Sequence, residues 1–180
     1  MKKLLILLAV ICSLSASAQV SKITLQASGL TCSMCSNSIN KALKTLPFVK
    51  SISPDIKSSS FEITVKPGTA ISFDEIKKKV EGAGFSLASM KAIVNFDGQK
   101  MVNDAHITTG GMTFHFLNVK DRVLSGNETI QILDKGFVPS KTFAKNAAYT
   151  KMACYKTGVA GSCCAKEGLS AGTRIYHVTI

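Results

Sequence analysis

The sequence predicts an α+β protein in two parts: strands and helices alternate over the first half, and the second half is made mostly of strands. Two observations lead to this fold class. Apolar residues recur at two-residue spacing in some segments and at three- or four-residue spacing in others, which are the periods of strands and helices. The composition, with 46% apolar and 18% charged residues in 180, is that of a globular chain, so wholesale disorder is excluded.

Residues 1–18 are predicted to be a secretory signal peptide. Lys2 and Lys3 form a basic start, residues 4–12 an uncharged apolar stretch, and residues 16–18 an A-x-A cleavage site. The apolar stretch is shorter than the roughly 18 residues of a membrane span, so no integral membrane segment is expected. We therefore expect an exported protein, periplasmic or secreted. Without the leader, the net charge falls from +11 to +9 and five of the six cysteines remain.

The first elements after the leader alternate in type. A strand is predicted over 22–28, where apolar residues alternate with polar ones, and Gly29 ends it. A helix of about three turns is predicted over 35–46, where apolar residues recur every three or four positions, and Pro47 ends it. A short strand over 48–53 follows.

Three more elements complete the first part. A strand is predicted over 58–66, where Phe and β-branched residues alternate with polar ones. A helix is predicted over 72–82, because Ser72 and Glu75 have the spacing of a capping box. A last strand over 85–96 gives the order strand, helix, strand, strand, helix, strand within about 75 residues, which is typical of a ferredoxin-like βαββαβ sandwich.

The second part is predicted to be a small, mostly-β domain of the partly open, OB-like barrel type. Asp97-Gly98 is predicted to form a tight turn between the two parts. Strands are predicted around Met112 to Phe116, over 129–133 and over 173–180, with one short helix over 141–148. The predicted division of the chain is therefore 1–18, 19–96 and 97–180.

The charge pattern argues against a nucleic-acid partner. The lysines are scattered, aromatic residues make up only 7% of the chain, and there is no Trp, so no basic run is interleaved with stacking side chains. The run Lys77–Lys79 is interpreted as a solvated helix face. The chain also has no Ser-His-Asp order or phosphate-cradling glycine loop. We therefore do not expect an enzyme.

The strongest chemical signal is GLTCSMC, residues 29–35, where a strand ends and a helix begins. Cys32 and Cys35 can point both sulfurs at one spot, and the helix dipole with its free N–H groups stabilises thiolates there. Two soft ligands suit an ion of low coordination number, Cu(I) foremost, whereas structural Zn(II) takes four ligands. On spacing alone, a redox dithiol, half of a zinc site and a structural pair stay open beside a soft-metal site.

Residues 21–94 resemble a heavy-metal-associated domain, through GLTCSMC and through EGAGF after the second predicted helix. This module occurs in copper chaperones, in copper-exporting ATPases and in the periplasmic mercuric-binding protein. The resemblance implies a ferredoxin-like fold in which Cys32 and Cys35 hold the metal ion. It also implies that the ion passes by thiolate exchange to a metal-transport or metal-accepting partner protein.

Three positions near the loop are interpreted through this resemblance. Leu30 replaces the Met of the family pattern G-M-T-C-x-x-C, and the exchange conserves volume at a position that packs inward in the family. Phe85 falls where relatives carry a side chain near the loop, which implies that it covers the site, although a plain core aromatic explains it equally well. Met34 lies at a variable position of the family and is not expected to be a ligand.

A second group of cysteines lies near Met152 and consists of Cys154, Cys163 and Cys164. One structural disulfide from Cys154 to Cys163 or Cys164 is the first interpretation, because exported thiols tend to be oxidised and adjacent cysteines rarely bridge each other. A second soft-metal site using two or three of these thiolates is the alternative. An unrelated free thiol is the third. The chain's three histidines are interpreted as lone core or polar residues rather than ligands: His106, His115 and His177.

The sequence therefore predicts an exported protein that binds and traffics a soft metal ion. Cu(I) is the first choice, and Hg(II) and Zn(II) are the other ions considered. Mercuric-ion scavenging by the same two thiolates is one alternative function, and an envelope thiol–disulfide redox protein is another. The redox alternative lacks the larger alternating α/β pattern in which thioredoxin-like motifs sit.

Overall fold

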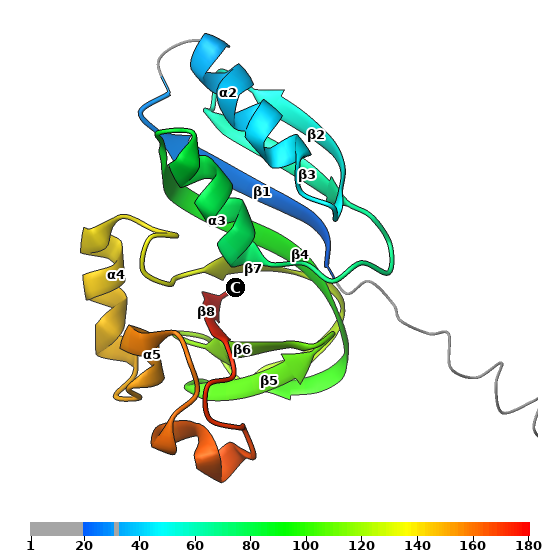
Figure 1. The fold of residues 1–180 in the computed structure, drawn as a ribbon. Helices are drawn as coiled ribbons and strands as arrows, with labels where there is room; N and C mark the ends of the chain where they lie inside the picture. Colours follow the sequence, from blue (N-terminus) through cyan, green and yellow to red (C-terminus); the bar gives the residue numbers. More distant parts are fainter. Residues whose placement is uncertain (1–19, 31–32) are drawn as a thin grey trace, which may run out of the picture.

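The structure is a computed structural model that describes residues 20–30 and 33–180. The predicted signal peptide lies outside the described residues. Six elements of the first part follow the predicted order (Figure 1): β1 (Val20–Ser28), α2 (Ser33–Lys44), β2 (Val49–Asp55), β3 (Ser60–Val65), α3 (Phe73–Gly82) and β4 (Ser86–Met101). Within the described ranges, no helix is long and apolar enough to cross a membrane.

These elements form the predicted ferredoxin-like unit. Its four strands are antiparallel and lie in the order β2-β3-β1-β4, and α2 and α3 lie on one face of them (Figure 1). In the register, Ile23 of β1 lies opposite Ile63 of β3 and Ala92 of β4, and all three side chains are buried. The alternation of apolar residues therefore sets which face of the sheet meets the helices.

Local sequence features explain where helix α3 begins and where helix α2 ends. The Ser72 hydroxyl accepts a hydrogen bond of 3.2 Å from the backbone N–H of Glu75, which confirms the predicted N-cap of α3. Phe73, Ile76 and Val80 form the buried stripe of this helix. Helix α2 ends at Lys44, just before Pro47, as the sequence predicts.

The predicted tight turn at Asp97-Gly98 is wrong, because β4 continues through these residues to Met101. The register of β4 against β7 (Arg122–Ile132) shifts between Asp97 and Gln99, and Gly98 has a left-handed φ of 69°. A β-bulge can place a glycine in the same left-handed conformation as a hairpin turn, so the local sequence fits both. The expected boundary between residues 96 and 97 falls inside this strand.

The second part is mostly β, as predicted. Its further elements are β5 (Ala105–Thr109), β6 (Met112–Phe116), α4 (Ser140–Asn146), α5 (Cys154–Thr157) and β8 (Ile175–Thr179), with short 3₁₀ helices η1 (Ala147–Tyr149) and η2 (Ser162–Glu167). The predicted short helix is confirmed as α4. Strand β8 pairs antiparallel with β7 and parallel with β6.

All eight described strands belong to one sheet with the order β2-β3-β1-β4-β7-β8-β6-β5. The pairings run from β2 to β5 without closing into a ring, so the expected OB-like barrel is not observed among the described strands. Strand β4 pairs with β1 over Ser86–Val94 and with β7 over Lys91–Met101. Closure would require the edge strand β5 to pair with the second edge of Asn95–Met101, and no described ladder joins them.

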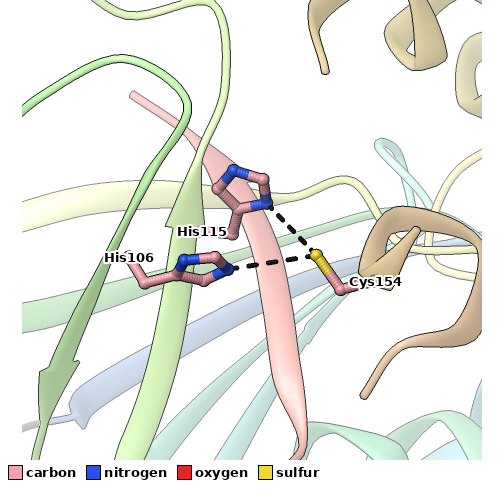
Figure 2. A group of neighbouring side chains, drawn as sticks. All are labelled: His106, His115 and Cys154. Carbon is pink, nitrogen blue, oxygen red and sulfur yellow. Dashed lines mark hydrogen bonds between the residues drawn. The ribbon is translucent and has the colours of Figure 1, made fainter. Parts of the chain in front are cut away.

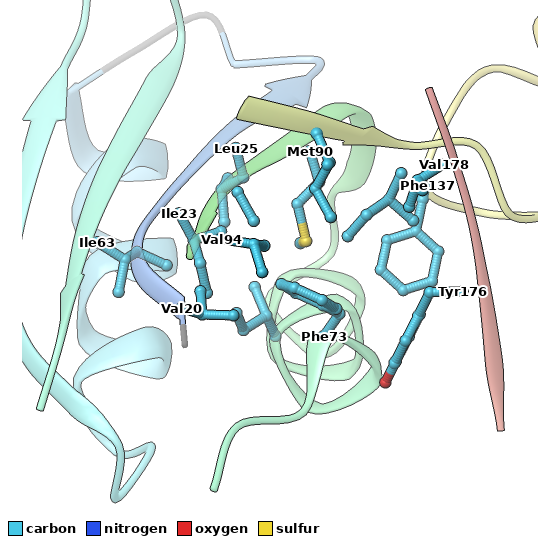
Figure 3. Packing of buried hydrophobic residues seen from close by; sticks show 14 of the residues in the cluster. Val20, Ile23, Leu25, Ile63, Phe73, Met90, Val94, Phe137, Tyr176 and Val178 are labelled. Atoms are coloured by element: carbon cyan, nitrogen blue, oxygen red, sulfur yellow. The ribbon is translucent and has the colours of Figure 1, made fainter. Parts of the chain in front are cut away.

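Both parts contribute to one hydrophobic core. Figure 3 shows Phe73 of α3 beside Tyr176 of β8, with their ring centroids 5.0 Å apart in an edge-on arrangement. Phe137 and Val178 from the second part join the same cluster as Met90 of β4. Burial of this shared apolar surface is the main force that holds the two parts together.

A polar contact crosses the same junction. The Arg174 guanidinium donates hydrogen bonds of 2.8 and 3.0 Å to the two carboxylate oxygens of Asp74, and the Tyr176 hydroxyl donates one of 3.0 Å to the same group. Desolvation opposes ionisation of Asp74, but the hydrogen bonds and charge of Arg174, helped by Tyr176 and Lys77, outweigh it and lower the pKa of Asp74. The first turn of α3 is thereby tied to β8.

Candidate metal centres

The first candidate centre is the predicted metal loop between β1 and α2. Strand β1 ends at Ser28, Gly29 has a left-handed φ of 82°, and α2 begins at Ser33. Cys35 lies in the first turn of α2 and is half-buried. Cys32 lies outside the described residues, so its role as a ligand stays a prediction.

The start of α2 favours a thiolate at Cys35. Helix N–H groups of the first turn have no partner within the helix, and the helix dipole places partial positive charge there. The first turn of α2 carries no acidic side chain that would oppose a negative sulfur. Lys41 and Lys44 in the last turn complement the opposite end of the dipole.

The neighbouring side chains have distinct surroundings. Met34 exposes 80% of its surface, so it does not belong to the core. Leu30 and Phe85 are partly buried and pack against the main hydrophobic cluster. For Phe85 the structure therefore gives a packing contact, and a covering role over the loop stays a prediction.

The second candidate centre begins with a row of three histidines. His106 of β5 pairs with His115 of β6, and His115 pairs with His177 of β8. The rings of His106 and His115 stack with centroids 4.3 Å apart, and those of His115 and His177 lie 5.1 Å apart. The interpretation of these histidines as lone residues is wrong, because strand register sets them side by side.

Cys154, the first residue of α5, faces two of these histidines (Figure 2). Its Sγ lies 3.9 Å from Nε2 of His106 and 3.9 Å from Nδ1 of His115. These three donor atoms all lie within 4.8 Å of one another. The side chain of His115 is fully buried and that of His106 is 2% exposed, so the group is closed to solvent.

Cys163 and Cys164 of η2 lie close to Cys154. The Sγ atoms of Cys163 and Cys164 lie 3.3 Å apart, and together with that of Cys154 they lie within 4.8 Å of one another. A disulfide bond is about 2.05 Å long, and none of the three sulfurs is bonded in the structure. The structure thus brings together all three cysteines that the sequence predicts as a second site or a disulfide.

Each of the two histidines that face Cys154 has a carboxylate on its other ring nitrogen. Nδ1 of His106 lies 2.7 Å from Oε2 of Glu167, which also accepts the backbone N–H of His106 at 3.0 Å. Nε2 of His115 lies 2.9 Å from Oδ1 of Asp104. A carboxylate only accepts hydrogen bonds, so the ring proton is assigned to the nitrogen beside it. The nitrogen that faces Cys154 is then left with its lone pair.

Burial controls the protonation of this group. Desolvation, with the electrostatic repulsion that a charged His115 would meet from His106 and His177, lowers the pKa of His115 to about 4, so this imidazole is neutral at pH 7. Burial and the hydrogen bond with Cys164 raise the pKa of Cys154. The hydrogen bond from Cys164 and a backbone hydrogen bond from Cys154 lower the pKa of Cys163. Cys163 is therefore the cysteine of this group most ready to form a thiolate.

Sequence reasoning missed His106 and His115 because they lie 48 and 39 residues from Cys154. No spacing pattern links residues so far apart. The only signal that could have found them is the register of β5 and β6, which places His106 and His115 opposite each other.

Comparison with known proteins finds a family match for the first part of the chain. Residues 24–86 match the family model of the heavy-metal-associated domain. Among solved structures, the yeast copper transporter domain Ccc2a, determined in apo and Cu(I)-loaded states, is 29% identical over 36% of this chain and 88% of that chain, with a TM-score of 0.33. The CopZ metallochaperone is 18% identical over 38% of this chain and 100% of that chain, with a TM-score of 0.35.

A third similar structure is the water-soluble region of the P-type ATPase CopA from Bacillus subtilis. It is 25% identical over 44% of this chain and 52% of that chain, with a TM-score of 0.35. Among curated proteins, no relative of the chain was found. The family match ends at residue 86, before the second candidate centre begins. The N-terminal unit of this chain, over residues 24–86, is a heavy-metal-associated domain.

Proposed function

We propose that this chain is an exported, non-enzymatic protein that binds a soft metal ion, Cu(I) foremost, between Cys32 and Cys35. The observation that carries the proposal is the family match over residues 24–86, which includes both cysteines. The ion leaves by thiolate exchange, in which the thiolates of a partner protein replace those of Cys32 and Cys35 one at a time.

The chemistry of the loop supports this function. Thiolate sulfur is a soft ligand that selects Cu(I) over hard cations such as Mg²⁺. Cys35 lies in the first turn of α2, where the helix terminus favours the thiolate form that metal binding requires. Two ligands leave the coordination sphere of Cu(I) open, so a third thiolate from a partner can enter before the first one leaves.

The direct test is a Cu(I) titration of the reduced full chain against a chromogenic Cu(I) chelator. The double variant Cys32→Ser with Cys35→Ser is expected to bind one Cu(I) fewer per chain than the natural sequence, because both ligands of the loop are lost. The matched control is Met34→Leu, which removes the exposed thioether between the cysteines and is expected to leave the stoichiometry unchanged. An unchanged Cu(I) count in the double variant would overturn the proposal.

The redox alternative is tested on the same preparation. A thiol–disulfide enzyme would turn over disulfide substrates, so the reduced full chain is expected to show no turnover in an insulin-reduction assay. Turnover that disappears in the Cys32→Ser, Cys35→Ser variant would replace metal trafficking with redox catalysis as the function of the loop.

A further inference from the structure

We propose that Cys154, Cys163, Cys164, His106 and His115 form a second metal site, buried in the C-terminal part and built for a four-coordinate ion of the Zn(II) kind. It is separate from the loop of Cys32 and Cys35 and does not depend on the function proposed for that loop.

The donor atoms already lie at distances that a metal ion can bridge. In a tetrahedral complex with Zn–S bonds of about 2.3 Å and Zn–N bonds of about 2.0 Å, neighbouring ligand atoms lie roughly 3.3–3.8 Å apart. The two contacts of Cys154 Sγ with the histidine nitrogens measure 3.9 Å, and the contact between Cys163 and Cys164 measures 3.3 Å. Cys154 belongs to two groups of three donors, each within 4.8 Å, so an ion bound at Cys154 gains a fourth ligand when side chains of the other group turn toward it.

The histidines are oriented for metal binding by their carboxylate partners. Histidines that bind metal ions in proteins almost always donate the other ring N–H to a carboxylate, a carbonyl group or water. Here Glu167 holds His106 and Asp104 holds His115 in this way, and both free nitrogens face Cys154. His177 also has a carboxylate partner, Asp134, so what sets His106 and His115 apart is that their other ring nitrogens both face the sulfur of Cys154.

The donor set selects the class of ion. Sulfur and imidazole nitrogen exclude Mg²⁺ and Ca²⁺, which take oxygen ligands. Mixed Cys and His ligands in a closed tetrahedral site are typical of structural Zn(II). Two thiolates balance the charge of Zn(II), and the nearby carboxylates of Asp104 and Glu167 favour a divalent over a monovalent cation. The same charges make this site a poorer place for Cu(I) than the loop.

The hydrophobic cluster around Cys154 is small. It contains only four buried residues among those described, and two of them are cysteines: Cys154, Ala160, Cys164 and Ile175. Helix α5 has four residues and η2 has six, so neither supplies much regular structure. A metal ion that joins α5, η2, β5 and β6 stabilises such a segment in the way that it stabilises small metal-dependent domains.

The test uses the full chain with Cys32→Ser and Cys35→Ser, so that the loop cannot take the ion. The protein is purified anaerobically under reducing conditions and titrated with Co(II) as a spectroscopic probe and then with Zn(II). We expect one ion per chain, a Co(II) spectrum with thiolate charge-transfer bands and the intense d–d bands of tetrahedral coordination, and displacement of Co(II) by Zn(II). No ion bound by the folded protein, or an ion bound without thiolate bands, would overturn the proposal.

Three further variants in that background test the ligands. His106→Gln removes a ligand on the edge strand β5 and is expected to weaken Zn(II) binding by at least about 100-fold. Glu167 only orients His106, so Glu167→Gln is expected to weaken Zn(II) binding about 10- to 100-fold. The matched control is His177→Gln, because this buried histidine is held by Asp134 and belongs to neither donor group. The Zn(II) affinity of the His177→Gln variant is expected to stay within about threefold of that of the Cys32→Ser, Cys35→Ser chain.

Circular dichroism of each variant separates loss of ligands from loss of fold. Unchanged Zn(II) affinity in a folded His106→Gln variant would contradict the proposal. So would a site that accepts Cu(I) but neither Co(II) nor Zn(II). A disulfide that includes Cys154, found by thiol alkylation and mass spectrometry of the protein from its native compartment, would also replace the metal site with a structural bridge.

Discussion

Gly98 shows how the backbone preference of one residue shapes the sheet. It has a φ of 69° at the point where the register of β4 against β7 shifts, and the neighbouring Asp97 N–H donates a hydrogen bond of 2.6 Å to Oε1 of Gln99. A residue with a Cβ atom is strained in this left-handed conformation. The bulge lets one strand continue from the first part of the chain into the second.

Replacement of Gly98 by Ala is therefore expected to lower the free energy of unfolding by about 1 kcal/mol. The cost is purely conformational, because a Cβ atom at Gly98 would meet nothing within 4 Å. Gly82→Ala in α3 is the matched control: this position is equally open and its φ is ordinary, so the substitution is expected to leave stability unchanged or slightly raised. Urea denaturation of both variants measures the difference, and equal effects would contradict the account of the bulge.

Residues close together in the sequence are the ones that sequence reasoning located. Cys35 and the Ser72 cap belong to local patterns, in which a few consecutive residues fix the conformation. The Asp97-Gly98 pair has a local pattern too, but one that a turn and a bulge share. The pairing of His106 and His115 depends on strand register, and their approach to Cys154 depends on the packing of α5, so no local pattern contains either.

Asp74 joins helix α3 to strand β8 through Arg174, the residue just before the strand, and through Tyr176 within it. The carboxylate lies in the first turn of α3, where the helix dipole also favours a negative charge, and it receives hydrogen bonds from Arg174 and Tyr176. Breaking this contact loosens one helix of the metal-associated domain from the C-terminal strand. The effect is modest, because both side chains keep about a third of their surface exposed.

Asp74→Asn is expected to lower the free energy of unfolding by about 1 kcal/mol at pH 7. The pKa of Asp74 is lower in the folded chain than in the unfolded one, so its contribution is complete above the pKa of an unfolded Asp, about 3.9. The contribution disappears as the pH falls through the folded pKa. The difference between the natural sequence and the variant should therefore shrink in acid.

Glu75→Gln is the matched control for this prediction. It removes the same charge from the same helical turn but does not touch the contact with Arg174. Thermal unfolding from pH 3 to pH 7 compares the two variants. If Glu75→Gln destabilised the chain as much as Asp74→Asn does, the stabilisation would come from the helix dipole and not from the link to β8.

At the level of elements, hydrophobic periodicity predicted the first part well and the second part less fully. The six elements of the ferredoxin-like unit form in the predicted order, and all but β2 bury one clear face. Strand β6 has buried residues on both faces, and β7 extends over eleven residues where the sequence predicts five. Tertiary burial, which periodicity alone does not reveal, sets the extent of such strands.

Across the whole molecule, β4 and the shared core join two sections that have different chemistry. The heavy-metal-associated domain carries Cys35 in the first turn of α2, whereas the C-terminal part carries its cysteines and histidines in a buried cluster. One sheet extends through both sections. With both proposals, the chain holds two metal sites with different ions.

Native mass spectrometry of the reduced full chain tests this claim most directly, after loading with Zn(II) and then with one equivalent of Cu(I). The natural sequence is predicted to carry one Zn(II) and one Cu(I). The Cys32→Ser, Cys35→Ser variant should lose only Cu(I), and His106→Gln should keep Cu(I) but release Zn(II) at a Zn(II)-chelator concentration that leaves Zn(II) on the natural sequence. Loss of both ions from either variant, or retention of both ions in both variants, would contradict the account.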